Sequence, residues 1–172
     1  MKLSHVFSLA ILFAFLGFSA SASAKNVNAR FTIPEGFEKL TKEQVDDLFP
    51  GQTPNLLAAS NESRNTTFFA EGTRIPEPEP TIERIFEKMP SMVSARVPDP
   101  LLISHTYMSI NGVRWAYIEF KSSDPSDVRY NILILTVHEG RFFRVHVAST
   151  IEEFNIHEES IRKCLSEIEL SS

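Results

Sequence analysis

The segment Ile132-Leu133-Ile134-Leu135 is apolar at four consecutive positions within a longer predicted strand, residues 128–137. Because successive side chains of a strand point to opposite faces of a sheet, both faces of this strand need apolar cover. Residues 141–148 alternate like a second strand and follow directly after Glu139-Gly140, which predicts a hairpin. The pattern therefore predicts a strand at the centre of an antiparallel sheet that carries helices on both faces.

A further hairpin is predicted around Asn111-Gly112, the dipeptide that most readily forms a two-residue type I′ turn. Residues 102–110 and 113–121 flank this turn with strand-like sequences. A two-residue turn also sets the register of the two strands. The predicted pairs are Ile110–Val113, Met108–Trp115, Thr106–Tyr117, Tyr107–Ala116, His105–Ile118 and Ile103–Phe120.

The helix boundaries are marked by capping residues. Thr41 and Gln44 have the spacing of a capping box, and Thr81 is expected to cap a second helix after the Pro-Glu connector 75–80. The closing helix is predicted to begin near Asn155 and to bury Ile161, Leu165 and Ile168. The remaining predicted elements are a strand at residues 29–33, an extended segment at 37–40, and a hairpin of 56–60 with 66–71.

The N-terminal segment has the features of a cleaved secretory signal. Lys2 precedes an apolar stretch at residues 6–18, and Ala22-Ser23-Ala24 fits the small-x-small cleavage site. We expect cleavage after Ala24, no membrane anchor afterwards, and a periplasmic or secreted location. Residues 25–172 then form a single domain, since 148 residues are too few for two.

Charge and cysteine content narrow the function classes. The whole chain has a net charge of −5, and removal of Lys2 makes the domain more negative, so binding to nucleic acid is not expected. Cys164 is the single cysteine, so the domain has no internal disulfide, which favours a bacterial periplasm over a eukaryotic secreted origin. We expect Cys164 to be a small buried residue.

No catalytic or metal-binding spacing is present. The histidines of the domain, His105, His138, His146 and His157, do not form a zinc-helix pattern, and no nucleophile elbow, phosphate loop or dinucleotide fingerprint occurs. Adjacent carboxylates such as Glu158-Glu159 point apart on a helix and indicate a solvated face. The sequence therefore predicts no enzyme, no metal and no cofactor.

A candidate surface for a partner lies on the predicted meander. Met108, Trp115 and Tyr117 share one face of the first hairpin, while Arg144 and His146 share one face of the last strand. Tryptophan and tyrosine are favoured at interfaces, so these five residues are the candidate contacts with a protein partner. The alternative for the aromatic group is a position in the core under a helix.

The order of the predicted elements resembles the PsbP-like fold. This fold is shared by a photosystem II accessory protein, a Ran-binding release factor of nuclear transport and small bacterial envelope proteins such as DcrB. The resemblance covers nearly all of residues 29–170 and rests on turn and core features. They are Phe31-Thr32-Ile33-Pro34-Glu35-Gly36-Phe37, Ile110-Asn111-Gly112-Val113-Arg114-Trp115, and a last helix with Ile161, Cys164-Leu165 and Ile168.

The resemblance implies an α+β fold, an α/β/α sandwich with an antiparallel sheet of about six strands, and a non-enzymatic role. It carries over no functional residue, because fold alone does not specify function. We expect an exported binding or assembly module of the bacterial envelope that recognises a protein partner, of the accessory, chaperone or toxin-immunity type. The alternatives are a hydrolase with an unrecognised His and carboxylate site, and a structural or stress-related periplasmic protein.

Overall fold

The computed structural model of the chain describes residues 28–49, 54–75, 79–97, 99–122 and 128–171. The signal segment and the centre of the Pro-Glu connector therefore lie outside the described residues. The described strands are β1 (Asn28–Arg30), β2 (Phe37–Lys39), β3 (Leu57–Asn61), β4 (Thr66–Arg74), β5 (Leu101–Ile110), β6 (Val113–Lys121), β7 (Arg129–His138), β8 (Arg141–Thr150) and β9 (Glu169–Ser171). The described helices are α1 (Lys42–Leu48), α2 (Ile82–Ser94) and α3 (Ile151–Ser166).

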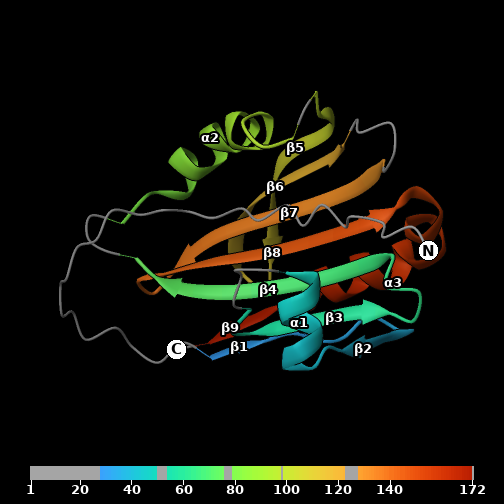
Figure 1. The fold of residues 1–172 in the computed structure, drawn as a ribbon. Helices are drawn as coiled ribbons and strands as arrows, with labels where there is room; N and C mark the ends of the chain where they lie inside the picture. Colours follow the sequence, from blue (N-terminus) through green and yellow to red (C-terminus); the bar gives the residue numbers. More distant parts are fainter. Residues whose placement is uncertain (1–27, 50–53, 76–78, 98, 123–127, 172) are drawn as a thin grey trace.

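The main sheet is antiparallel and has the strand order β2-β3-β4-β8-β7-β6-β5 (Figure 1). The expected α+β sandwich is confirmed, with seven strands where about six were predicted. The first strand is shorter than predicted and does not join this sheet, because β1 pairs with β9 in a separate two-stranded sheet. The sequence analysis did not predict β9.

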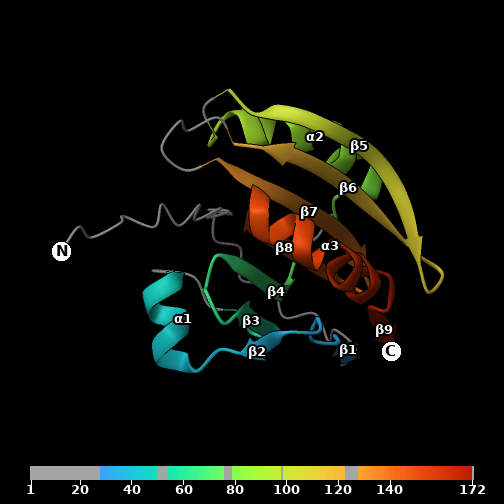
Figure 2. The same cartoon turned by 90° about the vertical axis from the view of Figure 1, so that its right-hand side faces the viewer.

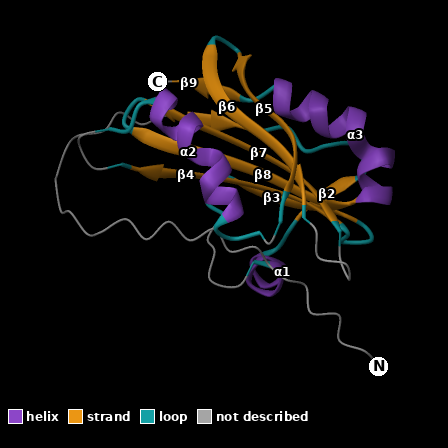
Figure 3. Ribbon diagram, turned by 90° about the horizontal axis from the view of Figure 1, so that it is seen from above, coloured by secondary structure: helices purple, strands orange, loops and turns teal. Residues whose placement is uncertain are grey.

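Strand β7 lies inside the sheet between β8 and β6, and both of its faces are covered, as predicted. Ile132 and Ile134 belong to the core under α3. Leu133 and Leu135 belong to the core under α2, which packs on β5, β6 and β7. The third helix, α1, packs against β3 and β4 around Phe69, and Figure 3 shows the three helices separated from one another.

The predicted register of the β5–β6 hairpin is correct from the turn as far as His105 opposite Ile118. The last predicted pair is wrong, because Leu102 and not Ile103 lies opposite Phe120. The register shifts between Leu102 and Ser104, so Ile103 is the extra residue of a β-bulge. The alternation of apolar and polar residues does not indicate this extra residue, because residues 101–103 are all aliphatic.

Threonines cap all three described helices. The predicted capping box of α1 is present, with Thr41 and Gln44 exchanging both hydrogen bonds, and Thr81 caps α2. The closing helix begins earlier than predicted, because Thr150 at the end of β8 accepts a hydrogen bond from the backbone of Glu153 and starts α3 directly. Ile168 is buried as expected, but it lies beyond the end of the helix.

A proline inside α2 explains the position of His105, one of the histidines considered in the sequence analysis. Pro90 has no N–H, so the carbonyl of Phe86, four residues earlier, loses its donor within the helix. His105 on β5 lies with its Nε2 3.0 Å from that carbonyl oxygen, and its ring stacks on the Phe86 ring at 3.8 Å between centroids. The imidazole therefore replaces the missing donor, and the helix continues to Ser94.

This arrangement predicts energetic coupling between His105 and Pro90. His105→Phe keeps a ring on Phe86 but removes the donor, and it should destabilise the protein by about 1 kcal/mol. In a Pro90→Ala background the cost should shrink, because the N–H of the new alanine can bind the Phe86 carbonyl. A double-mutant cycle by urea unfolding measures the coupling, and strictly additive effects would show that the two residues act independently.

Candidate binding site

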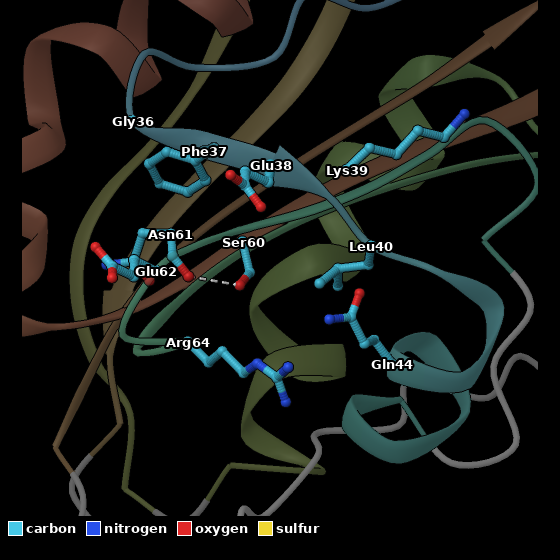
Figure 4. A pocket seen from close by; sticks show the side chains of 10 residues that line it. All are labelled: Gly36, Phe37, Glu38, Lys39, Leu40, Gln44, Ser60, Asn61, Glu62 and Arg64. Atoms are coloured by element: carbon cyan, nitrogen blue, oxygen red, sulfur yellow. Dashed lines mark hydrogen bonds between the residues drawn. The ribbon is translucent and has the colours of Figure 1, made fainter.

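A cavity of about 500 Å³ lies at the corner where β2, the β3–β4 turn and α1 meet (Figure 4). Its lining comes from three neighbouring elements, which are β2, the β3–β4 turn and α1. Strand β2 pairs with β3 so that Glu38 lies opposite Ser60, and the chain then turns at Leu40 into α1. The lining residues are Gly36, Phe37, Glu38, Lys39, Leu40, Gln44, Ser60, Asn61, Glu62 and Arg64.

Hydrogen-bond donors line one part of the cavity. The side-chain oxygen of Gln44 accepts from the backbone N–H of Thr41 at 2.8 Å, and its amide nitrogen is directed toward the cavity (Figure 4). The guanidinium of Arg64 lies on the same side of the cavity, while the ammonium of Lys39 points away (Figure 4). Arg64 is held at positive φ within the turn, where its N–H donates to the carbonyl of Asn61 at 3.0 Å.

Carboxylates line the other part. Glu38 and Glu62 balance the charges of Lys39 and Arg64, so the cavity carries both signs within one lining. The apolar side chains of Phe37 and Leu40 contribute the rest of the surface. A site of this mixed character suits a ligand that has acceptors, donors and apolar groups together, which is the chemistry of a polypeptide segment.

The turn that carries Glu62 and Arg64 is anchored to α3. Ser63 Oγ donates to one oxygen of the Glu153 carboxylate at 2.7 Å, and Asn61 Nδ2 donates to the other at 2.8 Å. His157 Nε2 lies 3.4 Å from the same carboxylate, and its ring packs edge-on against Phe37. These contacts fix the position of the turn. The sequence analysis did not predict the two hydrogen bonds to Glu153, because they join residues about 90 positions apart.

The predicted partner surface does not form one surface in the structure. Met108, Trp115 and Tyr117 lie in the core on the α3 side of the sheet, where Trp115 is fully buried. The alternative prediction, an aromatic cluster under a helix, is therefore confirmed for Trp115 and Tyr117. The other two predicted residues, Arg144 and His146, lie on the opposite face, so the five candidates are divided by the sheet itself.

Arg144 and His146 belong to a polar row on the α2 side. Arg144 Nε lies 3.0 Å from Glu71 on β4, and His146 Nε2 lies 3.2 Å from Asn131 Oδ1. His146 faces Leu133 across the β7–β8 pair, as predicted. Burial lowers the pKa of His146 to about 3, and the nearby charge of Arg144 adds to this effect, so the ring is neutral at physiological pH. Burial likewise raises the pKa of Glu71, although the charge of Arg144 opposes it.

Within the described residues, the three histidines that the hydrolase hypothesis named, His105, His138 and His146, do not lie together with an acid in one cleft. His105 is on β5, His138 and His146 lie at different positions of the β7–β8 hairpin, and His157 is on α3. Within the described ranges, no group of three or more His, Cys, Asp or Glu side chains is placed to hold a metal ion. The hydrolase hypothesis required at least two of His105, His138 and His146 to meet an acid in a pocket, and the described residues do not show this arrangement.

Cys164 is buried, as predicted. Its thiol donates to the carbonyl oxygen of Thr32 at 2.7 Å, which ties α3 to the segment after β1. Burial raises the pKa of this thiol, which favours the unreactive protonated form.

A buried polar network under α3 was also missed by the sequence analysis. Glu119 on β6 is 5% exposed, and its carboxylate accepts hydrogen bonds from Tyr117 at 2.6 Å, from Tyr130, and from Arg162 at 2.7 Å. Arg162 also donates to Glu158 one turn earlier on α3. The only sequence signal for this network was a charged residue at an inward position of a central strand.

Comparisons with known proteins place the fold. No family model and no curated protein matches the sequence. Several solved structures match it at low identity, and three of them match over most of their length. Cyanobacterial PsbP (CyanoP) from Synechocystis sp. PCC 6803 has a TM-score of 0.56 and 12% identity, over 91% of this chain and 99% of that one.

LpqN of Mycobacterium tuberculosis, described as involved in cell envelope biogenesis, has a TM-score of 0.65 and 7% identity, over 88% of this chain and 87% of that one. The protein of unknown function PA94 from Pseudomonas aeruginosa, a putative regulator by its description, has a TM-score of 0.51 and 10% identity, over 86% and 83%. None of the helices in the described ranges is long and apolar enough to cross a membrane. The likeness to CyanoP and LpqN, together with the seven-stranded sheet, shows that this chain has the PsbP-like fold.

Proposed function

We propose that this chain is an exported, non-enzymatic binding module of the bacterial envelope, and that it takes a segment of a protein partner into the cavity between β2, the β3–β4 turn and α1. The observation that carries the proposal is the mixed lining of that cavity, with the donors of Gln44 and Arg64 beside the carboxylates of Glu38 and Glu62. Backbone carbonyls of the segment accept from the donors, and basic groups or N–H groups meet the carboxylates.

Two further observations support this role. The lining is held by the contacts of Glu153 with Asn61 and Ser63, and a preformed site loses less entropy when a ligand binds. The likeness to LpqN, which is described as involved in cell envelope biogenesis, supports a place in the envelope. The predicted signal segment with its cleavage site at Ala24 supports export.

Selection from a displayed library of random peptides tests the proposal. Peptides enriched on the purified chain are synthesised, and their affinity is measured by isothermal titration calorimetry. Arg64→Glu reverses the charge at the donor side and should weaken binding about tenfold or more, which corresponds to at least about 1.4 kcal/mol. Arg84→Glu makes the same charge change at an exposed position on α2 and should leave the affinity unchanged.

Two outcomes would contradict this proposal. If no peptide is enriched, or if the enriched peptides bind Arg64→Glu and wild type equally, the cavity is not the recognition site. Circular dichroism of both arginine variants checks that the fold is retained.

A further inference from the structure

The guanidinium of Arg64 lines the cavity beside β2 and has no partner among the described residues. It makes no ion pair and no hydrogen bond there, although its backbone N–H donates to Asn61. Two carboxylates line the same cavity, those of Glu38 and Glu62, and neither pairs with it in the part of the chain that the structure describes. The positive charge is therefore left to a ligand.

The amide of Gln44 supplies a second donor, and the capping box of α1 fixes its direction. Gln44 Oε1 accepts from the backbone N–H of Thr41 at 2.8 Å, so the amide nitrogen is the atom that remains toward the cavity (Figure 4). A glutamate would form the same capping box, but it would present a second carboxylate oxygen in place of the amide nitrogen. The cap alone thus does not require glutamine, and the glutamine gives the cavity a donor.

The backbone of Arg64 has a conformation that does not favour an arginine. Its φ is 58°, in the left-handed region that glycine adopts freely and that asparagine and aspartate adopt more readily than other residues. The β3–β4 turn would therefore fold with less strain if a smaller residue stood at this position. The turn gives no reason for the long basic side chain, whereas the cavity that it lines does.

A carboxylate is the ligand group that matches these donors. A guanidinium binds a carboxylate through two parallel N–H···O bonds, and such charge-assisted bonds are roughly twice as strong as neutral ones. A phosphate would bring nearly two negative charges into a cavity that already contains Glu38 and Glu62, and a carboxylate brings one. The two glutamates in turn suit a backbone N–H or a basic group of the same ligand.

We propose that the segment bound in this cavity presents a carboxylate to Arg64 and Gln44. This inference rests on the proposed function, because it specifies the ligand of the same cavity. The carboxylate comes either from an aspartate or glutamate side chain of the partner or from the C-terminus of the partner chain. Both sources offer the same chemistry to the two donors, and the experiment below distinguishes them.

Selection on the purified chain from three synthetic libraries of short N-acetylated peptides tests the inference. Peptides of the first library have one acidic side chain and an amidated C-terminus, those of the second have only a free C-terminal carboxylate, and those of the third have neither. We expect binders from the first library, the second or both, which identifies the source of the carboxylate. Replacing that carboxylate by an amide should weaken binding tenfold or more, as measured by isothermal titration calorimetry.

Three variants of the chain connect this effect to the two donors. Gln44→Glu keeps the capping box but replaces the donor by an acid, and Arg64→Gln removes the charge. Each should weaken the carboxylate peptides tenfold or more, and the amide version of a peptide should bind Arg64→Gln about as well as wild type. Arg84→Gln makes the same change on α2, which packs over β5, β6 and β7 away from the β2 edge (Figure 2), and should leave the affinity unchanged.

The outcomes separate this inference from the proposed function. Peptides of the third library that bind wild type as tightly as carboxylate peptides, and that lose affinity in Arg64→Glu, overturn this inference but leave the cavity as a site for polypeptide segments. Carboxylate peptides that bind Arg64→Gln and Gln44→Glu like wild type also overturn it. Absence of binders from all three libraries overturns both proposals. Arg64→Gly relaxes the positive φ, so its loss of binding with an unchanged thermal midpoint shows that the side chain and not the fold was removed.

Discussion

Replacing Glu119 by alanine is expected to lower the free energy of unfolding by about 3–5 kcal/mol. The carboxylate is the common acceptor for Tyr117, Tyr130 and Arg162. Its removal leaves all three donors beneath α3 without this acceptor. The loss is large because donors in a partly buried site cannot all regain water. Urea unfolding followed by circular dichroism measures the change.

The dependence of stability on pH distinguishes this network from simple packing. Burial by itself raises the pKa of Glu119, but the hydrogen bonds from Tyr117, Tyr130 and Arg162 and the charge of Arg162 outweigh it, so the pKa lies below its usual value of 4.5. A carboxyl with a lowered pKa in the folded state contributes its stability above the unfolded pKa and loses it as pH falls. Wild type should therefore lose this contribution below about pH 4.5, and Glu119→Ala should lack that part of the decline.

A matched control is Glu169→Ala, which removes a carboxylate whose side chain is 57% exposed and which pairs loosely with Arg30. This variant should change stability by less than about 0.5 kcal/mol. Equal effects of the two substitutions would mean that the contacts of Glu119 add nothing beyond those of a surface acid.

Alanine substitutions at Leu133 and at Ile134 should each cost about 2–5 kcal/mol. The two side chains are neighbours in sequence but lie in different cores, Leu133 under α2 and Ile134 under α3. Both are at most 2% exposed, so each truncation removes apolar burial and leaves a cavity. Chemical denaturation of the two single variants measures the costs.

Thr106→Ala on β5 supplies the comparison, because Thr106 is exposed on an edge strand and should tolerate the change within about 0.5 kcal/mol. If only one of Leu133 and Ile134 is costly to truncate, then one face of β7 is not a packed core. That outcome would contradict the sandwich with helices on both sides of the sheet.

Much of the fold was predictable because its information is local. The Asn111-Gly112 turn set the β5–β6 register as far as His105, and Thr41 with Gln44 marked the start of α1. The all-apolar segment in β7 correctly predicted a strand covered on both faces. The start of α3 was predicted too late. Thr150 is both the last residue of β8 and the N-cap of α3, and a strand pattern does not indicate that a helix follows directly.

The candidate site was much less predictable. Met108, Trp115 and Tyr117 were considered for a partner surface by their chemistry alone, and only packing under α3 places them in the core. The cavity beside β2 depends on the β3–β4 turn being held by Glu153, which is a long-range contact. Polar residues such as Gln44 and Arg64 look like ordinary surface residues until that contact brings their elements together.

The sequence by itself determined the hairpins, the caps and the presence of a strand covered on both faces, because each depends on residues that are close together in the sequence. Only the tertiary structure decided that β4 pairs with β8, that β1 pairs with β9, and that Glu119 meets Arg162. These contacts join distant segments, and their free energy comes from burial that many residues share, so no short stretch of sequence specifies them.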